Sequence, residues 1–125
     1  MILPNTSLPE DPERGTLQIN DQTENQFALA CDLTAIPPDE RPAHESNSRH
    51  LLFEVVQEVR ELPDGYALRY AAEHFPALAS FIAAERLCCP FIAFTFEVAA
   101  QRGPIWLRLT GREGVKEFLM AELNR

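Results

Sequence analysis

The stretch Glu85-Arg86-Leu87-Cys88-Cys89-Pro90-Phe91 lies where a helical pattern of apolar residues ends and a strand pattern begins. Pro90 lacks a backbone N–H and disfavours helical dihedral angles at Cys89, so we expect the helix to end here. Pro76 suits the first turn of the same helix. The stretch therefore predicts a helix that runs from Pro76 to Cys88 or Cys89, followed at once by a strand.

A carboxylate interrupts the apolar stripe of this helix. At about 100° per residue, Leu78, Phe81 and Ile82 form one stripe, and Glu85 and the two adjacent cysteines continue it. An unpaired charge on a buried face is costly, so Glu85 needs a partner. Rigid elements hold side chains precisely enough for chemistry, and the end of a helix is therefore a good place for a site.

The bulk composition narrows the classes of function. The chain has 125 residues, 46% of them hydrophobic, which suits one domain with its own core. The formal net charge of −8 argues against nucleic acid or an anionic membrane as a partner, because both attract clusters of Lys and Arg. No apolar run approaches the roughly 18 residues of a membrane span, and the first residues lack a signal-peptide pattern. We therefore expect a cytoplasmic protein whose partner is a metal ion or another protein, a second copy included.

The N-terminal region differs from the rest of the chain. Residues 1–25 contain three prolines and five acidic residues against the single base Arg14, without a sustained period. We predict a disordered acidic tail over 1–25 and a single α+β domain over 26–125.

Alternating and helical patterns outline that domain, and Pro63-Asp64-Gly65 marks a hairpin turn within it. The predicted elements are a strand over 27–33, a helix from Pro42, strands over 56–62 and 66–71, the helix over 76–89, strands over 92–98 and 105–109, and a final helix that starts at Thr110 with a capping box. The first six elements follow the ferredoxin-like βαββαβ order, extended by a C-terminal strand and helix. We therefore predict an antiparallel sheet with helices mainly on one face.

This order brings distant residues to one edge of the sheet. In the ferredoxin-like arrangement, the strand after the second helix lies antiparallel beside the first strand. The end of the first strand, the start of the first helix and the end of the second helix then meet. The chemistry-bearing residues at these three places are Cys31, His44, Glu85, Cys88 and Cys89.

Three thiols and an imidazole at one edge indicate a metal site. In the cytoplasm thiols stay reduced, and thiolates select soft or borderline ions such as zinc, copper(I) or mercury(II). We predict Cys31, His44, Cys88 and Cys89 as ligands, with Glu85 as an orienting or proton-transfer group. The adjacent cysteines leave a regular helix about 100° apart, so both reach one ion only where Pro90 has broken the turn.

Two alternatives remain open. The first is a thiol redox enzyme, with a disulfide from Cys31 to Cys88 or Cys89. A disulfide between the two adjacent cysteines is disfavoured, because their Cα atoms lie only about 3.8 Å apart. The second is a non-catalytic interaction module whose cysteines belong to the core and whose Glu85 pairs with an arginine. Its candidate arginines are Arg41, Arg49 and Arg69.

Four segments of the chain resemble a family of short bacterial proteins that share a Glu-Arg-x-Cys-Cys-Pro-Phe motif and have no settled function. The segments are Cys31 to Pro37, Arg60 to Tyr66, Glu85 to Phe91 and Trp106 to Gly111. The resemblance covers residue 27 to the C-terminus, and it implies one small cytoplasmic bacterial domain. It assigns no catalytic residue.

Overall fold

The computed structural model of the protein describes residues 29–124, so the predicted acidic tail over 1–25 lies outside the described residues. Three α-helices and four strands make up this part of the chain. In chain order they are α2 (Arg41–Arg49), β2 (Glu58–Leu62), β3 (Gly65–Tyr70), α3 (Phe75–Cys88), β4 (Ala93–Val98), β5 (Ile105–Thr110) and α4 (Val115–Leu123). A π-helical turn, η4 (His50–Glu54), follows α2 directly.

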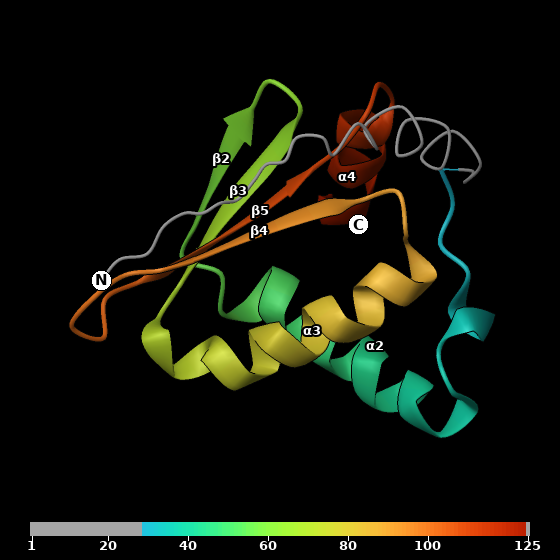
Figure 1. The fold of residues 1–125 in the computed structure, drawn as a ribbon, viewed down its shortest axis with the longest axis horizontal. Helices are drawn as coiled ribbons and strands as arrows, with labels where there is room; N and C mark the ends of the chain where they lie inside the picture. Colours follow the sequence, from blue (N-terminus) through green and yellow to red (C-terminus); the bar gives the residue numbers. More distant parts are fainter. Residues whose placement is uncertain (1–28, 125) are drawn as a thin grey trace, which may run out of the picture.

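The strands form one antiparallel sheet in the order β2-β3-β5-β4 (Figure 1). The predicted hairpin at Pro63-Asp64-Gly65 is confirmed, since Leu62 pairs with Gly65 across the turn between β2 and β3. Gly65 also faces β5, where an added Cβ atom would collide with the Leu109 carbonyl. Only glycine permits this close approach of the two central strands.

The α+β class and the antiparallel sheet are confirmed, but the predicted place of the first strand is wrong in the described residues. Of the predicted strand over 27–33, residues 27–28 lie outside the described residues, residues 29–30 form bends, and Leu33 begins a 3₁₀ turn, η2 (Leu33–Ala35). The partner of β4 is β5, which follows it in the sequence. The two are joined by a tight turn in which Gln101 and Arg102 adopt φ values of 60° and 58°. This local hairpin places β5 where the ferredoxin-like order expects the first strand.

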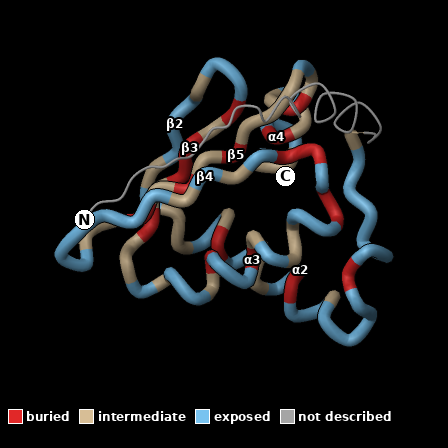
Figure 2. Tube along the Cα trace, viewed as in Figure 1, coloured by how far each residue is buried: buried red, intermediate tan, exposed pale blue. Residues whose placement is uncertain are grey.

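One core lies between the sheet and the helices. Ile105, Leu107 and Leu109 alternate as buried residues along β5, and they belong to one cluster with buried residues of α3, α4, η4 and β3. Figure 2 shows buried positions along the central strands and within α3. The intervening residues of β5 face the other side, where Arg108 pairs with Glu97 at 3.0 Å.

The last helix begins later than predicted. It starts at Val115 rather than at Thr110, because Gly114 has a φ of 97° and interrupts the helical backbone before it. In the described part of the chain, no helix is long and apolar enough to cross a membrane.

Candidate functional site

The sulfur atoms of Cys88 and Cys89 lie close together at the C-terminal end of α3. Cys88 is the last helical residue, and Cys89 leaves the helix with φ −127° and ψ 68°. The predicted helix end is therefore confirmed, and its cause is the proline at position 90, which disfavours helical geometry at the residue before it. Because the turn is broken at Cys89, the sulfurs of Cys88 and Cys89 lie 3.6 Å apart instead of diverging around a helix.

Cys31 reaches the same place from the segment before α2. Its sulfur forms a disulfide with Cys89, across 58 residues of sequence. The neighbouring backbone supports this position, since the Asp32 N–H donates a hydrogen bond of 2.7 Å to the Cys88 carbonyl. The expectation that all three thiols are reduced is therefore wrong for this state of the protein. The disulfide from Cys31 to Cys89 is one of the two pairings that the redox alternative proposed, and Cys88 keeps a free thiol.

Glu85 lies one turn before the cysteines and faces them. Its carboxylate oxygens lie 3.3 Å from the Cys89 sulfur and 3.8 Å from the Cys88 sulfur. In the disulfide state only Cys88 has a proton to donate, so the Cys89 contact becomes a hydrogen bond only after reduction. The Glu85 side chain is 18% exposed, and this burial raises the pKa of its carboxyl group, against the opposing effect of His44.

The partner of Glu85 is His44, not an arginine. Nε2 of His44 lies 2.9 Å from a Glu85 carboxylate oxygen, and the imidazole is 7% exposed. His44 sits in the first turns of α2, where its ring stacks on Phe81 of α3 with 5.9 Å between ring centres. The two helices are tied together beside it by Asn47, whose side-chain amide donates to the Ala77 carbonyl at 2.9 Å. A residue at the start of one helix and a residue near the end of another thus meet in one hydrogen bond.

The free thiol of Cys88 is a poor nucleophile in this state. Cys88 is 2% exposed, and burial together with the nearby Glu85 carboxylate raises the pKa of its thiol to about 12. Almost none of it is thiolate near neutral pH, although thiolate is the reactive and metal-binding form. A cation that arrives at the sulfur would change this balance, because metal binding releases the thiol proton.

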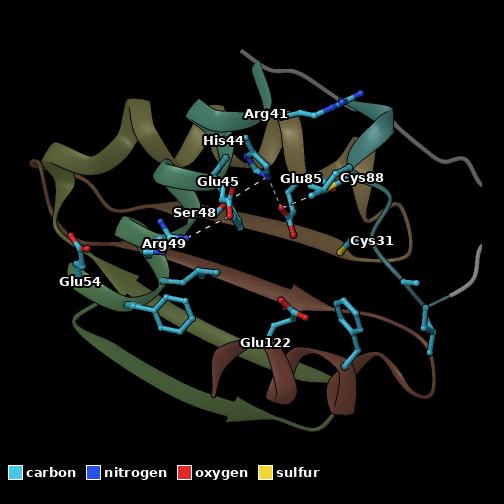
Figure 3. Close-up of a pocket in the computed structure, with 17 residues that line it drawn as sticks. Cys31, Arg41, His44, Glu45, Ser48, Arg49, Glu54, Glu85, Cys88 and Glu122 are labelled. Carbon is cyan, nitrogen blue, oxygen red and sulfur yellow. Dashed lines mark hydrogen bonds and ion pairs between the residues drawn. The ribbon is translucent and has the colours of Figure 1, made fainter. Parts of the chain in front are cut away.

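Four ligand-bearing residues converge closely enough to hold one ion. One ligand atom from each of Cys31, Glu85, Cys88 and Cys89 lies within 4.8 Å of the other three. His44 contacts this group through Glu85 and does not belong to it. The structure therefore brings all five predicted residues together, as three cysteine sulfurs, one carboxylate and an imidazole behind the carboxylate. Figure 3 shows Cys31, His44, Glu85 and Cys88 of this group.

The cluster borders a cavity of about 840 Å³ that the sequence did not predict. Figure 3 shows His44, Glu85 and Cys88 on one side of this space and Glu122 of α4 on the other. Its apolar walls come from several elements, and they are formed by Leu52, Phe53, Phe81 and Phe118. These residues are ordinary core or surface apolar residues in the sequence, so no local pattern could have indicated that they enclose a space.

Comparisons with known proteins found no match. This holds for protein-family models, for curated proteins and for solved structures.

Proposed function

We propose that the reduced protein binds one thiophilic metal ion through Cys31, Cys88 and Cys89, with Glu85 as the fourth ligand, and that it sequesters or transfers this ion. The observation that carries the proposal is the convergence of four ligand atoms within 4.8 Å. Zinc, copper(I) and mercury(II) are the ions that a thiolate-rich site selects.

The sulfur positions support a compact site. A tetrahedral zinc ion with Zn–S distances of about 2.3 Å has sulfur atoms about 3.8 Å apart. The sulfurs of Cys88 and Cys89 are already separated by 3.6 Å. Reduction of the disulfide frees the third sulfur, that of Cys31, whose neighbour Asp32 is anchored by its backbone N–H to the Cys88 carbonyl.

The histidine and the carboxylate take different roles in this proposal from those that the sequence predicted. Glu85 belongs to the inner group and His44 lies behind it, so we assign Glu85 as a ligand and His44 as its orienting partner. Partners of this kind fix the direction of a ligating side chain, and their loss weakens metal binding by about 10- to 100-fold.

The disulfide gives the site a closed state. While Cys31 and Cys89 are bonded to each other, neither sulfur is a thiolate ligand. A cytoplasmic location, which we propose from the composition, would keep the thiols reduced and the site open. Oxidation would release the ion.

The direct test is a titration of the reduced protein with cadmium(II) in the absence of oxygen. Cadmium–thiolate bonds have a charge-transfer absorption in the ultraviolet, so the signal counts sulfur ligands. We expect about one ion per chain, and a much weaker signal in Cys88→Ser because a thiolate is lost. His44→Leu should bind about 10- to 100-fold more weakly than the wild type.

His50→Leu is the matched control for His44→Leu. His50 forms a similar contact of 2.8 Å with Glu54, on an exposed surface away from the thiols. We expect this variant to bind cadmium like the wild type. Equal binding by the wild type and by Cys88→Ser would contradict the proposal and favour a module whose cysteines are structural.

A thiol redox function is the second candidate, and the disulfide itself favours it. A redox enzyme needs a reactive thiolate, however, and burial holds the Cys88 thiol in its protonated form. The two sulfurs also lie at the C-terminal end of α3, where the helix dipole does not stabilise a thiolate. Metal binding is therefore the function that the geometry supports better.

A further inference from the structure

The two sulfurs of the disulfide differ in their surroundings. Cys31 is exposed and lines the 840 Å³ cavity, whereas Cys89 is fully buried and does not line it. A thiol that approaches from the cavity therefore meets the Cys31 sulfur first. The disulfide presents one reactive atom to a small molecule and shields the other.

The cavity also restricts which thiol can enter. Its volume is that of a site for a small organic molecule, and aromatic or aliphatic side chains form much of its wall. Four glutamates line it against two arginines. Both arginines already have partners. Arg49 lies 3.6 Å from Glu45, and Arg41 donates a hydrogen bond of 2.9 Å to the Ile36 carbonyl. An anionic thiol is thus repelled, and an uncharged apolar thiol is accepted.

We propose that a small, uncharged thiol with an apolar body enters this cavity and attacks the Cys31 sulfur, which forms a mixed disulfide there and releases Cys89 as a free thiol. The bond between the two cysteine sulfurs breaks, and a bond between the entering sulfur and Cys31 forms. The proton of the entering thiol ends on the Cys89 sulfur, with the Glu85 carboxyl 3.3 Å away to pass it on. The electrons balance, because one disulfide replaces another.

This inference goes beyond metal binding and holds whether or not the chain takes up an ion. It assigns the cavity as the place where the organic part of the thiol binds and Cys31 as the residue that carries it. A second equivalent of thiol would then release the symmetric disulfide and leave Cys31 and Cys89 reduced.

The test uses the oxidised full-length chain, benzyl mercaptan as the apolar thiol and glutathione as the anionic one. Reactions are stopped with acid at early times, and mass spectrometry of peptides locates the adduct. The same reactions on the chain unfolded in guanidinium give the intrinsic reactivity of each thiol. We expect the folded adduct on Cys31 rather than Cys89, and a preference for benzyl mercaptan about tenfold greater in the folded than in the unfolded chain.

Phe53→Ser tests the cavity without disturbing the buried core, since Phe53 lines the cavity and is 41% exposed. We expect the benzyl mercaptan reaction to slow about fivefold, because an apolar wall is lost. Leu87→Ser is the matched control, as Leu87 is 51% exposed and does not line the cavity. An adduct mainly on Cys89, or the same thiol preference in folded and unfolded chains, would overturn the proposal. Loss of metal binding would leave these results unchanged.

Discussion

Two histidine–glutamate pairs of this protein have nearly the same contact distance but differ strongly in burial. His44 contacts Glu85 at 2.9 Å with side chains 7% and 18% exposed, and His50 contacts Glu54 at 2.8 Å with side chains 47% and 59% exposed. The first pair is buried beside three sulfurs, and the second is exposed to solvent on η4. A histidine–glutamate contact therefore forms part of a candidate metal site here only where it is buried and lies beside other ligand atoms.

The largest expected effect is the loss of stability on removal of the Cys31–Cys89 disulfide, which lies beside the buried pair. Cys31→Ser should lower the free energy of unfolding by about 4 kcal/mol, from the chain entropy of a loop of 58 residues. Urea unfolding of the oxidised proteins measures the difference. Under strong reductant the wild type and the variant should become equally stable. If the oxidised wild type and the oxidised Cys31→Ser variant had the same urea midpoint, the disulfide would not stabilise the fold.

The next effect is on the reactivity of the thiol beside the buried pair. With the pKa of Cys88 raised to about 12 from an ordinary 9.0, iodoacetamide should alkylate it roughly a thousandfold more slowly in the folded than in the unfolded chain. Mass spectrometry of the oxidised protein over time gives the rate, since Cys88 is then the free cysteine among the described residues. Comparable rates in both states would mean that the site is open to solvent.

The two pairs should respond differently to removal of their histidines. His44→Leu leaves a buried carboxyl group without its partner, which should cost about 1–3 kcal/mol of stability. His50→Leu removes an exposed i,i+4 pair and should cost at most about 0.5 kcal/mol. Urea midpoints of the two variants, measured side by side, test the contrast. Equal losses would erase the distinction between the pairs.

The smallest expected effect is a dependence on pH. The pKa of Glu85 is raised in the folded protein above its ordinary value of 4.5 by burial, so the folded state binds more protons than the unfolded state in the range just above that value. The stability of the wild type relative to Glu85→Gln should therefore be greatest at low pH and fall as the pH rises past 4.5. Urea midpoints of the two proteins across this range measure the difference, and a difference that does not change with pH would contradict the prediction.

Local signals in the sequence predicted much of this molecule, but not the pairing of β4 with β5. Pro90 indicated the end of α3, and Pro63-Asp64-Gly65 indicated the first hairpin, because each acts on the backbone of its immediate neighbours. The place of β5 beside β4 depends on a choice between two possible partners for the same strand edge. That choice is made by the tight turn at Gln101 and Arg102, two residues that do not usually adopt left-handed backbone angles.

The sequence likewise predicted which residues form the candidate site, but not how they contact one another. The predicted topology placed His44 and Glu85 at one edge of the sheet, but it could not show that the two side chains face each other. Cys31 was expected at the end of a strand, and it reaches the site through a bend and a disulfide. The site residues were therefore predicted to meet because of a ferredoxin-like strand order, and in the described residues they meet without its first strand. Contacts between distant segments depend on the whole fold, and the cavity beside them does so even more.

The most direct test of the central claim is the zinc content of the protein in its two redox states. Oxidised and reduced samples are prepared without oxygen, exposed to the same zinc solution, freed of unbound metal and measured by elemental analysis. We predict about one zinc per reduced chain and almost none per oxidised chain, because the disulfide removes two of the three thiolates. Equal zinc contents in both states, or no zinc in the reduced state, would contradict a metal site that depends on the reduced thiolates.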